Sequence, residues 1–143
     1  MKWERRNVKK YEIKNKKAMI KEPEHKDLKD RTKKFSIRVI NLVKQLDNTL
    51  GDREIGRQLI RSGMSVGANT RAAFRGRSKK EFVAKLGVVI EEADESSFWM
   101  EMLEKTSGSS KLNKQELNAL NKETVELTSI FVSVAQKNKK EIK

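Results

Sequence analysis

Four carboxylates lie within five residues of one another, at Glu91, Glu92, Asp94 and Glu95. Carboxylates that project into a helical bundle can hold a pair of iron ions, but such a site also needs Glu-x-x-His pairs on facing helices. The only histidine of the sequence is His25, and there is no cysteine. This shortage also rules out Ser-His and Cys-His nucleophiles. The sequence therefore predicts no catalytic residue, metal site or cofactor. We interpret the cluster as a solvated acidic face that pairs with basic neighbours, and a carboxylate-bridged metal enzyme is the remaining alternative.

A dense basic segment precedes the acidic cluster. Residues 53–85 carry nine Lys/Arg and two acids, whereas residues 86–136 carry four Lys/Arg and nine acids. At about 100° per residue, five arginines of the basic segment fall within an arc of about 80° on one helix face. This arginine stripe consists of Arg53, Arg57, Arg61, Arg71 and Arg75, and the basic segment continues with Arg77, Lys79, Lys80 and Lys85.

These nine residues together predict a nucleic-acid-binding surface. A guanidinium group donates two parallel hydrogen bonds to phosphate and stays charged at any working pH. No aromatic residue alternates with the stripe, so we expect contact with the phosphate backbone of RNA, or of an RNA/DNA hybrid, rather than base stacking. The alternative is that the arginines pair with the acidic stretch 86–136, within one subunit or across an oligomer interface.

The elements that must position these residues are long amphipathic helices, because apolar residues recur at three- and four-residue steps. We expect helices over about 27–47, 52–74, 78–105 and 113–137. Asp52 is a candidate N-cap, and Ser78–Glu81 and Asn113–Glu116 have the spacing of helix-start signals. Long helices joined by short connections predict an all-α, antiparallel up-down four-helix bundle.

The helix that carries the arginine stripe is also rich in small residues. Each glycine inside a helix costs roughly 1 kcal/mol relative to alanine. Gly56, Gly63 and Gly67 therefore predict that a neighbouring helix approaches closely.

Some apolar residues exceed what the core faces of the helices require. They are Ile60, Met64, Phe74 and Trp99. We expect these side chains to form a second buried surface, and hence a homo-oligomer.

The two ends of the 143-residue chain contribute much of its net charge of +13. Residues 1–26 lack a sustained apolar period and predict a flexible basic arm, residues 27–138 form the predicted bundle, and residues 139–143 form a basic C-terminal tail. No stretch approaches the roughly 18 apolar residues of a membrane span. We therefore expect a cytoplasmic protein without a membrane partner.

Several short motifs occur in a fixed order along the second and third predicted helices. They are Arg61–Asn69 (RSGMSVGAN), Arg77–Phe82 (RSKKEF), Lys85–Leu86 (KL), Glu92–Glu95 (EADE) and Trp99–Leu103 (WMEML). From about Asp27 to Lys137 the chain thereby resembles the four-helix-bundle family of 23S ribosomal-RNA intervening-sequence proteins. Thr70 and Ala73 depart from the aromatic residue and the glutamate that are common in the family.

The resemblance implies bundles that assemble into homopentameric barrels. The family that the chain resembles also includes the accessory variability determinant of diversity-generating retroelements, which associates with a reverse transcriptase and its template RNA. The resemblance thus implies a non-catalytic RNA-binding accessory protein. The alternative is a structural homo-oligomer of the intervening-sequence type, whose arginines mainly pair across subunit interfaces.

Overall fold

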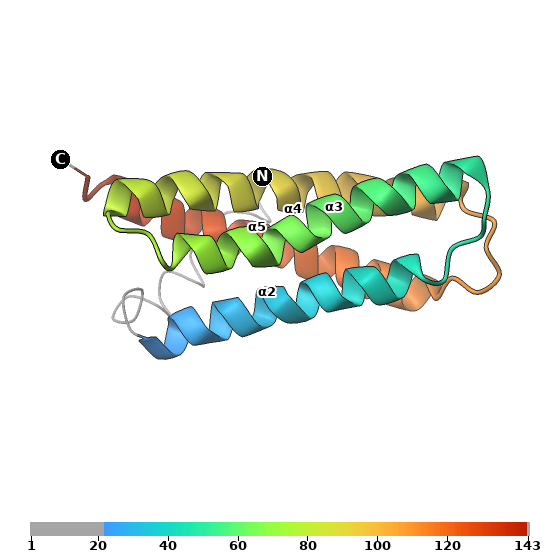
Figure 1. Ribbon diagram of the computed structural model, residues 1–143, viewed down its shortest axis with the longest axis horizontal. Helices are drawn as coiled ribbons and strands as arrows, with labels where there is room; N and C mark the ends of the chain where they lie inside the picture. Colours follow the sequence, from blue (N-terminus) through green and yellow to red (C-terminus); the bar gives the residue numbers. More distant parts are fainter. Residues whose placement is uncertain (1–21, 143) are drawn as a thin grey trace.

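The computed structural model describes residues 22–142, with side chains from Lys26 onward. The described chain is all-α, without strands, and its four helices lie side by side as a bundle (Figure 1). The helices are α2 (Glu22–Val43), α3 (Leu50–Ala73), α4 (Lys79–Thr106) and α5 (Lys114–Lys139). The predicted all-α bundle is confirmed. None of these helices combines the length and apolar composition that a bilayer crossing requires.

The outer helix ends lie further out than the sequence predicted. Helix α2 begins at Glu22 rather than near Asp27, so the last five residues of the predicted flexible arm 1–26 are helical. The physical reason is Pro23, which fits the first turn of a helix because the amide hydrogen it lacks has no helical partner there. The rest of the predicted arm lies outside the described residues. Helix α5 extends to Lys139, the first residue of the predicted tail 139–143.

Each of the other helix starts is fixed by a side-chain cap. Ser78 and Asn113 cap α4 and α5 as predicted, by accepting from the amides of Glu81 and Glu116 at 3.1 and 3.0 Å. The predicted N-cap of α3 was wrong, because Thr49 rather than Asp52 caps that helix. The Asp52 carboxylate is buried and accepts from the Asp47 amide and the Ser107 hydroxyl.

The core is an apolar seam to which all four helices contribute. Its largest fully buried side chains are Phe35, Val39 and Leu42 of α2, Leu59 and Val66 of α3, Leu86, Met100 and Leu103 of α4, and Leu117, Leu120, Leu127 and Phe131 of α5. The buried hydroxyls of Thr32, Thr70 and Thr124 each donate to the carbonyl four residues earlier. These polar groups therefore enter the core without an unsatisfied hydrogen bond.

Helices α2 and α3 touch through small residues, as the glycines predicted. A Cβ atom added to Gly63 would lie 2.8 Å from both methyl carbons of Val39. A Cβ atom added to Gly67 would lie 2.7 Å from the Ser36 hydroxyl, which donates to the Gly63 carbonyl at 2.8 Å. The absence of side chains at these two positions lets the helices approach this closely.

The other side of α2 is held to α5 by ion pairs. Arg31 donates two hydrogen bonds to Glu123, at 2.8 and 2.6 Å, and its guanidinium also lies 3.2 Å from Glu126. Arg38 donates two to Glu116, at 3.1 and 2.8 Å. These bidentate contacts fix the rotation of α2 about its own axis.

The glycine contact yields a matched pair of stability predictions. We expect Gly63→Ala to lower the free energy of unfolding by about 1–3 kcal/mol, because overpacking against Val39 outweighs the gain in helix propensity. Gly87→Ala, where nothing lies within 4 Å of the added Cβ atom, should raise it by up to about 1 kcal/mol. Urea unfolding followed by circular dichroism measures both. Equal effects at the two positions would contradict a tight α2–α3 contact.

Candidate nucleic-acid interface

The arginine stripe lies where the helical period predicted, exposed on α3 and opposite its buried face. The neighbouring helices nevertheless divide it into three parts. Arg71 and Arg75 line a groove beside α2, Arg53 and Arg57 line a cleft near the α2–α3 connection, and Arg61 reaches toward α4.

The first part belongs to a groove of about 470 Å³ between α2 and α3, which we call the α2/α3 groove. Its basic walls are Lys26, Lys29 and Lys33 of α2, Arg71 of α3 and Arg75 just after α3, with Asp30 as the one carboxylate in the lining. Its floor is Ser36, Ile37, Ile40, Met64, Gly67 and Ala68. None of the five cations forms an ion pair within the described part of the chain. The groove is therefore positively charged at its rims and apolar at its base.

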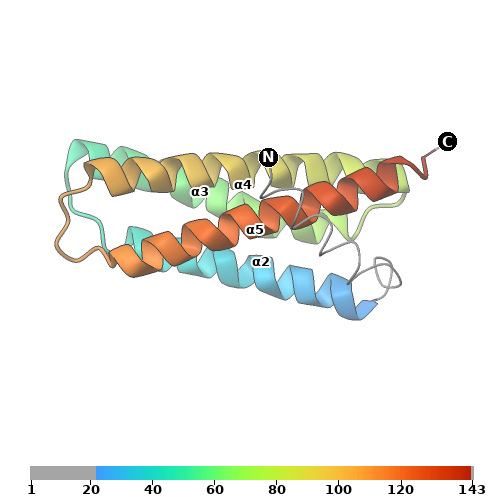
Figure 2. The same cartoon turned by 180° about the vertical axis from the view of Figure 1, so that it is seen from behind.

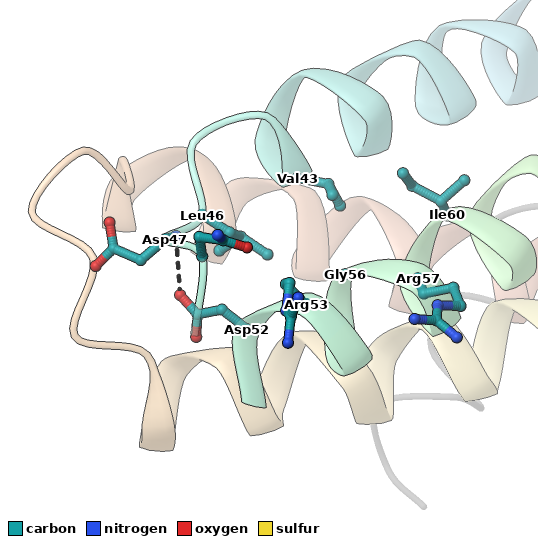
Figure 3. A pocket seen from close by; sticks show the side chains of 9 residues that line it. Val43, Leu46, Asp47, Asp52, Arg53, Gly56, Arg57 and Ile60 are labelled. Atoms are coloured by element: carbon teal, nitrogen blue, oxygen red, sulfur yellow. Dashed lines mark hydrogen bonds between the residues drawn. The ribbon is translucent and has the colours of Figure 1, made fainter. Parts of the chain in front are cut away.

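The second part is a cleft of about 470 Å³ at the connection between α2 and α3. Figure 3 shows Arg53, Arg57 and Ile60 along α3, with Val43 and Leu46 on the α2 side. The guanidinium of Arg57 lies 3.8 Å from the carboxylate of Glu54, three residues earlier on the same helix. That contact is exposed and contributes little stability.

The third part, Arg61, is paired within the same chain. It donates to Glu92 at 3.2 Å and to Glu95, and Glu95 also accepts from the Trp99 indole at 3.3 Å. The hydrogen bond with Glu95 raises the pKa of Arg61, and the hydrogen bond from Arg61 holds the pKa of Glu95 below its ordinary value. The predicted pairing between the basic segment and the acidic cluster thus exists, for one arginine and two of the four carboxylates.

The remaining predicted cations gather near the connection from α3 to α4. Arg77, Lys79 and Lys80 are exposed there, and Lys79 pairs with Glu141 just after α5. The start of α2, the α3–α4 connection and the end of α5 lie at the same end of the bundle in both views (Figures 1 and 2). We call this cluster the basic end and define it as Arg77, Lys79, Lys80, Lys137, Lys139 and Lys140. Lys85 lies one to two turns into α4 and is half-buried.

Three groove cations, Lys26, Lys29 and Lys33, were not predicted from the sequence. Their spacing of three and four residues places them on one side of a helix. That pattern was visible in the sequence, but only the position of α2 against α3 turns this side toward Arg71 and Arg75.

The four residues predicted to form an oligomer interface have different environments. Met64 is 47% exposed on the groove floor, and Ile60 is half-buried beside the other cleft. Phe74 packs on Phe82 with ring centroids 5.4 Å apart, and Trp99 packs against the core. Apolar side chains that the prediction left out are more exposed, namely Leu50 at 77%, Phe98 at 50% and Ile37 at 48%.

The acidic cluster on α4 was also considered as a metal site. Among the described residues, no group of three or more His, Cys, Asp or Glu side chains has the arrangement to hold a metal ion.

Comparison with known proteins identifies the family. Residues 24–133 match the 23S rRNA-intervening sequence proteins, and the chain belongs to this family. A crystal structure of a protein of unknown function from the S23 ribosomal protein family of Bacteroides thetaiotaomicron is similar, with 29% sequence identity and a TM-score of 0.67. The match covers 76% of this chain and 98% of that chain. No curated protein matches the sequence. The family resemblance that the motifs predicted is confirmed.

The Arg61–Glu95 and Arg38–Glu116 contacts predict that each glutamate titrates independently of the other pair. We expect Arg61→Met to raise the pKa of Glu95 toward its ordinary value of 4.5, although the Trp99 hydrogen bond will keep part of the shift. The pKa of Glu116, which the Arg38 hydrogen bond lowers, should not change; Arg38→Met should do the reverse. Carboxyl-detected NMR titration measures both groups in each variant.

The same pairs determine how stability depends on pH. Because the folded-state pKa of Glu95 and Glu116 is lowered, each pair stabilises the fold above the ordinary carboxyl pKa and loses this effect as the pH falls through the lowered value. Each variant should therefore differ more from the native chain in stability at pH 7 than in acid. A variant that shifts both glutamates equally would contradict the assignment of partners.

Proposed function

We propose that this protein is a non-catalytic, cytoplasmic RNA-binding accessory protein that associates with a reverse transcriptase and its template RNA in a diversity-generating retroelement. In this proposal each protomer is an antiparallel up-down bundle within a homopentamer. The retroelement partner and the pentamer follow from the resemblance to accessory variability determinants. The RNA contact is supported by the charge of the described surface.

The observation that carries the RNA proposal is the basic end. Lys79 and Lys80 occupy the first two positions of α4, where the positive end of the helix dipole makes a cation unfavourable by some tenths of a kcal/mol. Lys80 and Arg77 form no ion pair within residues 26–142 that could offset this cost. A bound phosphate would offset it, because it would accept from lysine and from free amide groups at the helix start.

The composition of the surface also favours phosphate over bases. The basic end contains Arg77, Lys79, Lys80 and the lysines at the end of α5. The nearest aromatic residues, Phe74 and Phe82, are half-buried and pack on each other rather than standing free among the cations. Contacts of this kind position a nucleic acid without reading its sequence. We therefore propose binding of structured RNA through its backbone.

A salt titration with two matched variants tests this proposal. We expect the triple variant Arg77→Gln, Lys80→Gln, Lys140→Gln to reduce the slope of log affinity against log salt concentration by roughly 2, since each lost phosphate contact removes about 0.7–0.9 from it. The control Lys105→Gln, Lys111→Gln, Lys114→Gln removes the same charge from exposed positions near the α4–α5 connection. It should leave the slope close to native. Fluorescence anisotropy with labelled structured RNA measures both.

Two outcomes would contradict the assignment to the basic end. Equal losses in the two triple variants would mean that only net charge matters. Binding that disappears only when residues 1–26 are removed would assign RNA contact to that segment instead.

The reverse-transcriptase partnership has its own test. We expect a tagged copy of this chain, co-expressed with the reverse transcriptase and template RNA encoded beside it, to retain the enzyme through purification. Because the proposal includes direct protein contact, the enzyme should stay bound after nuclease treatment. If nuclease treatment releases the enzyme, the two proteins are held together only through RNA, and the direct contact is contradicted. A locus that encodes no reverse transcriptase would contradict the partnership itself.

A second candidate function is a structural homo-oligomer whose arginines pair across subunit interfaces. The observation that favours it is the pairing of Arg61 with Glu92 and Glu95, which already draws one stripe arginine to the acidic helix. Under this function, RNA binding would be weak and unaffected by the basic-end variant.

A further inference from the structure

The α2/α3 groove has the form of a surface that another helix covers. Ile37 and Met64 on its floor are 48% and 47% exposed, although both are large apolar side chains. Basic residues stand on both sides of this floor, three from α2, one from α3 and one just after α3. A helix that filled the groove would need an apolar side chain at its centre and carboxylates around it.

This chain carries such a helix face itself, on α4. Glu91, Asp94, Phe98 and Glu101 follow one another at steps of three, four and three residues, so they share one side of the helix, and all four are exposed. We call them the α4 outer face. Its three carboxylates form no ion pair within the described region, whereas Glu92 and Glu95, on the adjacent edge, are held by Arg61.

Phe98 is positioned in advance to act as the apolar anchor of this face. Its ring is 50% exposed and packs edge-on against Trp99, with centroids 4.9 Å apart. Trp99 is in turn fixed by its hydrogen bond to Glu95. An anchor that is already ordered loses little conformational entropy when it binds.

We propose that the α4 outer face of one copy docks in the α2/α3 groove of a second copy, an inference that rests on the homo-oligomer of the proposed function and names the surfaces that form it. Phe98 then covers the apolar floor at Ile37 and Met64, and the carboxylates of the α4 outer face meet the lysines and arginines of the groove walls. The other occupant that this chain could offer, its N-terminal segment 1–21, is itself rich in lysine and arginine and would be repelled. Charge complementarity therefore selects α4.

The two docking surfaces lie on different sides of one protomer. In both views α4 runs along one long edge of the bundle and α2 along the other (Figures 1 and 2). Each copy therefore offers its groove to one neighbour and its α4 outer face to another, which is a heterologous contact. Repetition of such a contact gives a closed ring when the rotation between copies closes, and a filament when it does not.

A charge exchange tests this contact. The variant Glu91→Lys, Asp94→Lys and the variant Lys29→Glu, Lys33→Glu each place like charges across the interface, so each should be monomeric where the native chain assembles. A chain that carries all four substitutions has the native net charge and restores opposite charges across the interface. It should recover the native particle mass. Light scattering measures mass, and circular dichroism shows that each variant is folded.

Phe98→Ala provides a second measurement that leaves charge unchanged. Removal of a central aromatic anchor should weaken assembly by roughly tenfold or more. The proposal is overturned if the native chain is monomeric at all concentrations. It is also overturned if either double variant assembles like the native chain, or if the folded chain with all four substitutions stays monomeric. None of these substitutions touches the basic end, so every protomer keeps its phosphate contacts. The basic-end variant, in turn, should lose RNA affinity and keep the native particle mass, which distinguishes failure of the proposed RNA contact from failure of this interface.

Discussion

The contact between Gly63 and Val39 sets the distance between α2 and α3, and the surface of the molecule depends on that distance. An added Cβ atom at Gly63 would lie 2.8 Å from the valine methyl groups, so even one carbon atom there would push the helices apart. The glycines weaken α3 as an isolated helix, and the packing they permit compensates for this. Because α2 lies this close, the lysines on its outer side face the same groove as Arg71 and Arg75.

Helix α2 is oriented by its own charges as much as by its apolar side. Arg31 and Arg38 turn toward α5 and are neutralised there by glutamates, whereas Lys26, Lys29 and Lys33 turn toward the groove and stay without ion pairs in the described part of the structure. The side chains of the Arg31–Glu123 and Arg38–Glu116 pairs are only 18–34% exposed, and each guanidinium donates two hydrogen bonds to its carboxylate. This bidentate geometry favours one rotation of the helix, which determines which cations remain for a partner.

Much of the fold could be predicted from the sequence because local sequence patterns determine it. The spacing of apolar residues predicted four helices, and Ser78 and Asn113 correctly predicted two of the helix starts. The start of α3 was misplaced because Thr49 and Asp52 are both suitable caps, and the buried role of Asp52 depends on Ser107, which is distant in sequence. The site was harder to predict for the same reason. Helical angles placed five arginines on one face, but only the positions of α2 and α4 divide them between a groove, a cleft and an internal ion pair.

The proposed assembly and the proposed RNA binding need not compete for the same cations. The groove contact would use Lys29, Lys33, Arg71 and Arg75, whereas RNA would contact Arg77, Lys80 and the lysines at the end of α5. In a ring with cyclic symmetry every copy points the same way along the axis. In the proposed assembly the basic ends would then lie at one level, as a rim of positive charge. An RNA that reaches two neighbouring copies gains affinity without any new kind of contact, because the second contact is intramolecular. Under the two proposals, the interface between copies would therefore determine how strongly the assembly binds RNA.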